Sequence, residues 1–131
     1  MKKIVSALPR VLLGFILFAS GLAGLLNLIP PPPESMQGAA ALYMSGLGGT
    51  YLITLVKLTE VTAGVLLLAN RFVPLALVII APVVINIAAF HLFYAPSGLA
   101  VPVLMIAAQL YVAWQHRAAF VPVLEAKQAA A

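Results

Sequence analysis

The chain has 131 residues, enough for one domain, and 64% of them are hydrophobic while only 8% are charged. Soluble domains carry roughly 25% charged residues, and a small domain buries only about two-thirds of the surface that its unfolded chain exposes. This composition therefore excludes an ordinary soluble globular protein and predicts a membrane protein. The formal charge of +4 comes from cations that form no basic stripe with aromatic residues between them, so we expect no nucleic-acid partner.

Four apolar stretches predict an all-α integral membrane four-helix bundle, because each approaches the roughly 20 residues that cross a bilayer core. The predicted spans cover about residues 11–29, 49–69, 73–93 and 99–116. Proline, glycine and asparagine separate them, at Pro30–Pro33, at Asn70 with Pro74, and at residues 94–98. The whole chain, 1–131, is thus predicted to be a single transmembrane domain that ends in a polar tail at 117–131.

Two shorter features near the N-terminal half need a separate interpretation. Residues 36–44 (MQGAAALYM) are apolar but too short to span a bilayer, so we expect a short interfacial helix in the first outer loop. The first span also resembles a secretory signal, with Lys2 and Lys3 before it and small residues at 19–21. Its apolar run continues to Ile29, longer than a usual signal core, so we expect it to be retained.

The cations predict the orientation in the membrane. The two connections that follow the first and third spans contain neither lysine nor arginine. Cytoplasmic loops carry an excess of these residues, which places both termini in the cytoplasm. Six of the seven cations fall on that side: Lys2, Lys3, Arg10, Arg71, Arg117 and Lys127. We therefore expect a multi-pass membrane protein with both termini in the cytoplasm.

The seventh cation, Lys57, lies inside the second span, three residues before Glu60. Residues at that spacing share a helix face, about 60° apart. At a rise of about 1.5 Å per residue, Glu60 is about 16 Å and Lys57 about 21 Å from Arg71, deep in the bilayer core. A charge at such depth costs at least about 2.5 kcal/mol, so the pair is expected to face the bundle interior or a wet cavity.

Other polar side chains are predicted at similar depth. Asn86 lies in the third span and Asn27 near the end of the first, on the face that carries Ser20 and Gly24, while His91 could reach them from the rim. Three interpretations stay open for such a cluster: a buried structural network, a site for a polar-headed ligand, and a proton pathway. The candidate ligand-binding residues are Lys57, Glu60, Asn86, His91 and Asn27.

No other motif points to chemistry. The chain has no cysteine, and its two histidines lie in different spans, so we expect neither disulfides nor a metal site. No nucleophile–base arrangement or phosphate loop is present, so we name no catalytic residue. Gly14, Gly21, Gly24 and Gly64 are expected to let helices pack closely.

The segment from Lys57 to His91, KLTEVTAGVLLLANRFVPLALVIIAPVVINIAAFH, resembles the DoxX family of small membrane proteins. The shared pattern is Lys-x-x-Glu, a following glycine, a basic turn, Pro-Leu-Ala-Leu, and then proline, asparagine and histidine. Arg10, Gly14, Phe18 and Gly21 resemble the opening helix of the family. The resemblance extends over about residues 8–117 and is specific only in the central segment.

The resemblance implies a four-helix membrane bundle with Lys57, Glu60, Asn86 and His91 as a shared polar core. Relatives in the wider group include a thiosulfate:quinone oxidoreductase subunit, a maturation factor and members of oxidative-stress complexes, so no single chemistry follows from the fold. From this resemblance we expect a non-catalytic subunit or assembly factor of a redox or oxidative-stress complex in a bacterial inner (cytoplasmic) membrane. Its candidate ligands are a quinone-like molecule or a membrane lipid, and a protein partner is expected. A quinol-handling oxidoreductase subunit and a small transporter or proton pathway are the alternatives. Homo-oligomerisation stays open.

Overall fold

The computed structural model describes residues 1–130, and across them the chain forms helices and turns without strands. The predicted all-α class is therefore confirmed. The α-helices of this part of the chain are α1 (Lys2–Leu25), α2 (Gly38–Gly48), α3 (Tyr51–Leu68), α4 (Val73–Tyr94), α5 (Ala100–Gln115) and α6 (Arg117–Phe120). Short 3₁₀ turns lie at η1 (Pro33–Met36), η2 (Pro96–Gly98) and η3 (Pro122–Leu124).

Three of these helices, α1, α3 and α4, are long and apolar enough to cross a membrane. Only 22–28% of the most apolar stretch of each helix is buried inside the protein, so most of that stretch is not enclosed by other parts of the chain. Large exposed apolar surfaces of this kind are rare on soluble monomers. The fold is thus compatible with a multi-pass membrane protein. The fourth predicted span corresponds to α5, which is apolar but has only 16 residues.

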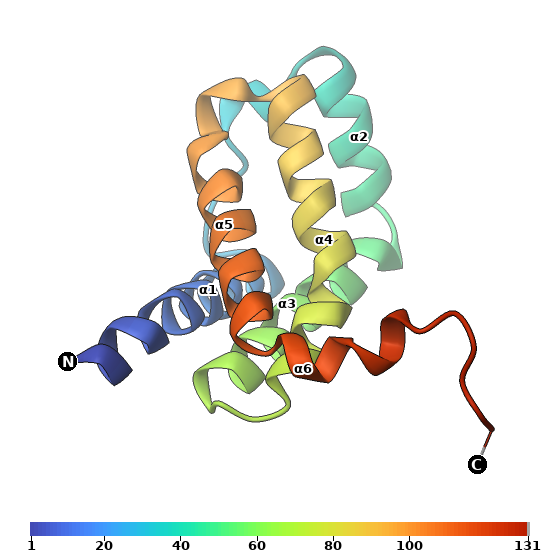
Figure 1. Ribbon diagram of the computed structural model, residues 1–131. Coiled ribbons are helices and arrows are strands. Elements are labelled where there is room, and N and C mark those ends of the chain that lie inside the picture. Colours follow the sequence, from blue (N-terminus) through green and yellow to red (C-terminus); the bar gives the residue numbers. More distant parts are fainter. Residues whose placement is uncertain (131) are drawn as a thin grey trace.

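Figure 1 shows how the helices are arranged. α4 and α5 run side by side, whereas α1 and α3 form a second pair that crosses them at the base of the view. α2 lies next to α4, and it begins and ends later than the predicted helix at 36–44. The N-terminus and the segment after α6 both lie at the base.

The turns between helices follow from local backbone chemistry. At the end of α3 the Arg71 amide donates to the Leu66 carbonyl at 2.9 Å, and the Asn70 amide donates to the Leu67 carbonyl at 3.2 Å. This is the pattern of a Schellman cap, in which a residue with positive φ reverses the chain. Asn70, with φ 54°, occupies that position. The predicted turn between the second and third spans is confirmed.

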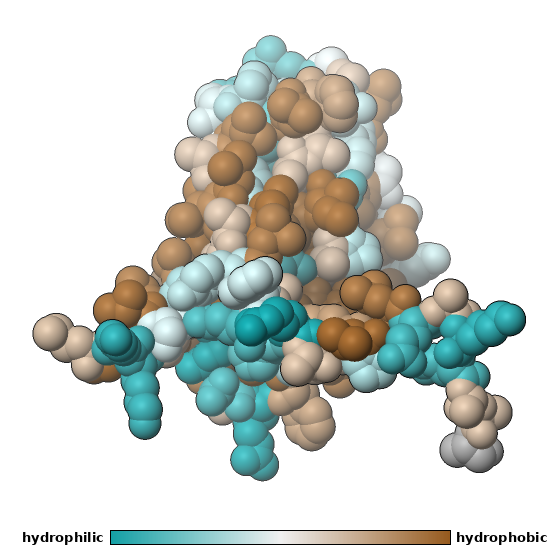
Figure 2. Space-filling view, viewed as in Figure 1, coloured by the Kyte–Doolittle hydropathy of each residue, from teal (hydrophilic) through white to brown (hydrophobic). Residues whose placement is uncertain are grey.

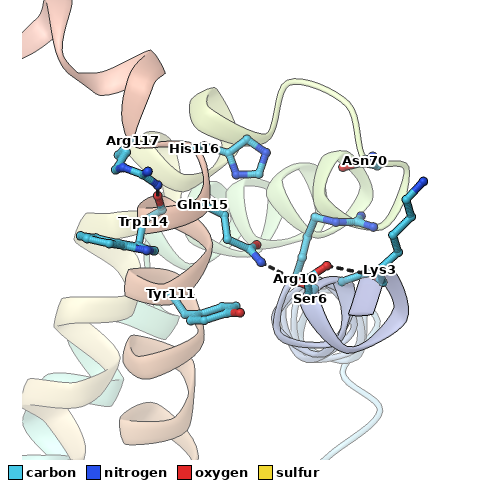
Figure 3. A pocket seen from close by; sticks show the side chains of 10 residues that line it. Lys3, Ser6, Arg10, Asn70, Tyr111, Trp114, Gln115, His116 and Arg117 are labelled. Carbon is cyan, nitrogen blue, oxygen red and sulfur yellow. Dashed lines mark hydrogen bonds between the residues drawn. The ribbon is translucent and has the colours of Figure 1, made fainter. Parts of the chain in front are cut away.

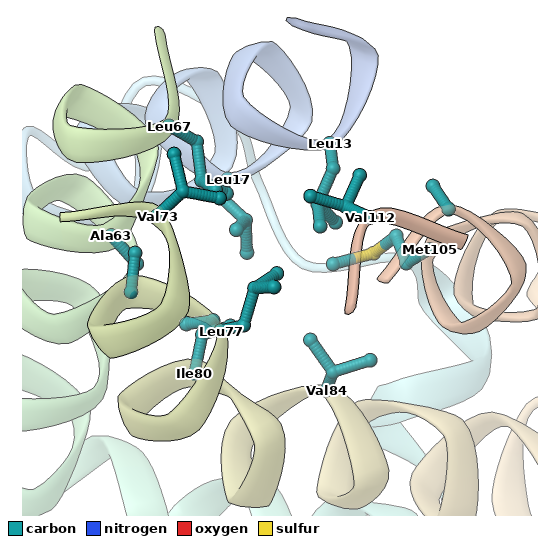
Figure 4. Packing of buried hydrophobic residues seen from close by; sticks show 12 residues of the cluster. Leu13, Leu17, Ala63, Leu67, Val73, Leu77, Ile80, Val84, Met105 and Val112 are labelled. Carbon is teal, nitrogen blue, oxygen red and sulfur yellow. The ribbon is translucent and has the colours of Figure 1, made fainter. Parts of the chain in front are cut away.

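The hydrophobic core lies where α1, α3, α4 and α5 meet, and each of these helices contributes side chains to it (Figure 4). Polar side chains tie the same helices together, because Gln109 of α5 donates to the Leu77 carbonyl of α4 at 2.9 Å. Gln115 of α5 similarly donates to the Ser6 carbonyl of α1 at 2.9 Å. The buried core residues are Leu13, Leu17, Ala63, Leu67, Val73, Ala76, Leu77, Ile80, Val84, Met105, Ala108 and Val112.

Glycines bring the backbones of α1 and α3 into contact. A β-carbon added to Gly64 would lie 2.6 Å from the Phe18 amide nitrogen and 2.9 Å from the Gly14 carbonyl oxygen. A β-carbon on Gly21 would lie 2.9 Å from the Val61 amide nitrogen. Small residues are used in this way where helix axes approach closely, so the prediction of tight packing at these glycines is confirmed.

Candidate functional site

Lys57 and Glu60 form an ion pair on the side of α3 that faces α1. The Lys57 Nζ lies 3.0 Å from both carboxylate oxygens of Glu60, so the carboxylate accepts two hydrogen bonds from one ammonium group. The three-residue spacing on a helix makes this contact possible, as the sequence predicted. The Glu60 side chain is 1% exposed, whereas that of Lys57 is 21% exposed.

α1 completes the site with a hydroxyl group and a gap. The Ser20 Oγ donates to Glu60 Oε2 at 2.8 Å, so Glu60 receives hydrogen bonds from both helices. Gly24 lies one turn further along α1, and a β-carbon there would come within 2.7 Å of the Lys57 Cδ and Cε atoms. The absence of a side chain at Gly24 therefore makes room for the lysine stem. We call Ser20, Lys57 and Glu60 the polar cluster.

Lys57 and Ser20 are each only partly buried in the polar cluster, whereas Glu60 is buried. An ammonium group carries three N–H donors, and Glu60 accepts two of those of Lys57. The Lys57 side chain is 21% exposed, so part of it reaches the surface of the protein. Chemically, Lys57 can donate to a carbonyl, carboxylate or phosphate oxygen. The buried Glu60 cannot be reached directly and instead orients and neutralises the lysine.

Asn27 does not belong to the polar cluster, which corrects the prediction for this residue. α1 begins at Lys2 and ends at Leu25, earlier than the predicted limit at Ile29, so Asn27 lies beyond the helix. Asn27 is exposed and has φ 51°. Its backbone amide donates to the Gly24 carbonyl at 3.4 Å. The Leu28 amide donates to the Ala23 carbonyl at 2.9 Å, which completes a second Schellman cap. Asn27 therefore ends a helix, as Asn70 does.

Asn86 and His91 also lie outside the polar cluster, because each makes its hydrogen bond with another partner. Asn86 is on an exposed face of α4, and its side-chain amide donates to the Tyr43 hydroxyl of α2. The His91 Nδ1 is 2.8 Å from the Ile87 carbonyl of its own helix, and its ring packs against Gly98. Glu60 is hydrogen-bonded to α1 and Asn86 to α2, and depth along the sequence alone could not reveal this difference in direction.

Ser20 is the residue of the site that the sequence prediction did not select. Its position on the face of Gly24 was apparent, but serine is common on transmembrane helix interfaces and often bonds only to its own backbone. Here its hydroxyl lies 3.3 Å from the Leu17 carbonyl as well as 2.8 Å from Glu60.

We expect Ser20→Ala to lower the free energy of unfolding by about 1.5–3 kcal/mol, the usual contribution of a hydrogen bond to a charged group. Thermal unfolding in detergent micelles, followed by circular dichroism, measures this change. Ser45→Ala is the matched control, because that exposed hydroxyl bonds only to the Leu42 carbonyl of its own helix. Equal melting temperatures for the two variants would contradict a stabilising role for Ser20.

Residues 1–130 contain no group of three or more histidine, aspartate or glutamate side chains that could hold a metal ion. Comparison of the chain with protein-family models, with curated proteins and with solved structures gave no match.

Proposed function

We propose that this protein is a non-catalytic accessory subunit or assembly factor of a bacterial inner membrane, and that the polar cluster binds the polar head of a quinone-like or lipid ligand. The observation that carries the proposal is the partly exposed position of Lys57, with Glu60 buried behind it. Ionisable side chains within apolar helices are expensive to maintain and commonly mark functional sites.

The proposed ligand class follows from the accessible donor. One ammonium N–H beside apolar helix surfaces suits a molecule with an oxygen acceptor at one end and an apolar body at the other. Quinones and lipid esters have this shape. The Gly24 gap holds the lysine stem along α1, so the donor direction is defined before a ligand arrives.

The proposed topology has four spans, α1, α3, α4 and α5, with both termini cytoplasmic. The distribution of cations supports this topology, because cytoplasmic segments carry an excess of lysine and arginine. The segments that gather at the base contain four such residues, Lys2, Lys3, Arg71 and Arg117. α2 would then lie in the outer loop region. The proposed role in a redox or oxidative-stress complex rests on the resemblance of residues 57–91 to the DoxX family.

Mass spectrometry of the intact protein released from native membranes tests the ligand site. We expect a quinone or lipid adduct on the wild-type protein and its loss from the Lys57→Met variant, because the variant removes the accessible donor. Thr54→Val is the control, since Thr54 is exposed on the same helix and its side chain makes no hydrogen bond within residues 1–130.

Added decylubiquinone provides a second measurement. A ligand that binds the folded state raises the melting temperature, so we expect an increase for the wild type and none for Lys57→Met. The same increase in both proteins would contradict binding at Lys57. If no quinone or lipid is retained and none shifts the melting temperature, the polar cluster has a structural role only.

A further inference from the structure

A second polar site lies at the base of the molecule, away from the polar cluster. It is an open recess of about 520 Å³ between the first turns of α1, the α3–α4 turn and the end of α5 (Figure 3). One face of α1 lines the recess, since residues three and four apart share a face of a helix. The residues on this face are Lys3, Ser6, Ala7 and Arg10. The other lining residues are Asn70, Tyr111, Trp114, Gln115, His116 and Arg117. We call this set the basic recess.

The basic recess holds positive charge without a counter-charge. Lys3, Arg10 and Arg117 line it, and no carboxylate does. Within residues 1–130 the only ion pair joins Lys57 to Glu60, so the cations of the recess have no acidic partner. Lys3 and Arg10 lie on one face of α1, and like charges so placed repel one another unless an anion binds near them.

The side chains of the recess are positioned by contacts with neighbouring helices. The Arg10 guanidinium donates to the Leu67 carbonyl at the end of α3, which holds it beside Asn70. Lys3 extends from the same face of α1 toward Asn70, and His116 faces them from the end of α5 (Figure 3). Gln115 joins α5 to α1 at the recess by donating to the Ser6 carbonyl at 2.9 Å.

The location of the recess indicates a membrane–water interface. Figure 2 shows hydrophilic side chains along the base and apolar side chains over the body above it. Trp114 is 65% exposed and Tyr111 is 45% exposed, and such aromatic residues prefer the headgroup level of a bilayer. The Arg117 guanidinium lies 4.8 Å from the Trp114 ring centroid, a cation–π distance. An anion at this level would most readily be a lipid headgroup.

We propose that the basic recess binds the phosphate group of an anionic phospholipid. Lys3 and Arg10 would donate to the phosphate oxygens, and Asn70 and His116 would complete the cradle. Basic pockets between helices at the cytoplasmic surface are suited to such headgroups. This site is independent of the polar cluster, so either one can fail without the other.

Native mass spectrometry of the intact protein, titrated with phosphatidylglycerol or with phosphatidylcholine of the same acyl chains, tests the proposal. We expect phosphatidylglycerol to bind about tenfold more tightly. Lys3→Gln, which removes an exposed side chain, should weaken phosphatidylglycerol binding about fivefold, and Lys3→Gln/Arg10→Gln should abolish the preference. Lys2→Gln and Lys2→Gln/Lys127→Gln are the matched controls, because they remove equal charge outside the recess.

Three results would overturn the proposal. Equal binding of the two lipids would show that the recess does not recognise an anionic headgroup. Equal weakening by the control variants would show that net surface charge alone attracts the lipid. Displacement of phosphatidylglycerol by millimolar inorganic phosphate would assign the recess to free phosphate instead. The Lys3→Gln variant keeps the Arg10 contact to α3, so its binding can be measured on a folded protein.

Discussion

Gly64→Ala is expected to lower the free energy of unfolding by at least about 3 kcal/mol, the upper part of the usual range for overpacking. The added β-carbon would lie 2.6 Å from the Phe18 amide nitrogen and 2.9 Å from the Gly14 carbonyl oxygen, and these backbone atoms cannot rotate away as a side chain can. α1 and α3 would have to separate, which would also weaken the Ser20 contact to Glu60. Reversible unfolding of the purified protein in mixed micelles measures the loss.

Gly46→Ala is the matched control and is expected to have the opposite sign. A β-carbon at Gly46 meets no atom within 4 Å, and the residue lies inside α2. Alanine stabilises a helix interior by about 0.5–1 kcal/mol relative to glycine, so this variant should be slightly more stable than the wild type. Similar stabilities for the two alanine variants would show that α1 and α3 do not pack through Gly64.

Lys57→Met is expected to destabilise the protein by about 3 kcal/mol, because it leaves the buried Glu60 carboxylate without its cation. Glu60→Gln should be less harmful, since the remaining Lys57 ammonium is partly exposed and the oxygen of the new side-chain amide could still accept hydrogen bonds. The double variant Lys57→Met/Glu60→Met should recover most of the stability, because a well-packed apolar pair can replace a buried ion pair at little cost.

A double-mutant cycle measured by the same unfolding experiment decides this prediction. Additive losses in the double variant would mean that the two side chains do not act as a pair. The cycle also separates stability from binding. If the double variant is stable and still retains the quinone or lipid adduct, the polar cluster is not the ligand site.

The helix ends show how far local sequence reached. The turn at Asn70 was predicted because asparagine, arginine and proline interrupt the apolar pattern there. Asn27 occupies the same cap position, with φ 51° against 54° for Asn70, yet the sequence prediction places it within the first span. Apolar residues continue through Leu28 and Ile29, so hydropathy gave no sign that the helix had ended. The signal available in the sequence was the asparagine itself, because asparagine is one of the few residues that occupy the left-handed position at the end of a helix.

Composition, the length of the apolar stretches and the residues that interrupt them determined the all-α class and the apolar helices. The three-residue spacing on one helix determined the pairing of Lys57 with Glu60, because it involves only residues close together in the chain. Only the tertiary structure decided which polar side chains meet. The close approach of α1 and α3 at Gly64 brings Ser20 to Glu60, and the crossing of the helix pairs separates Asn86 and His91 from them. Nearly uniform apolar helices leave rotation about their axes undetermined by pattern, so packing between distant segments sets which face is buried.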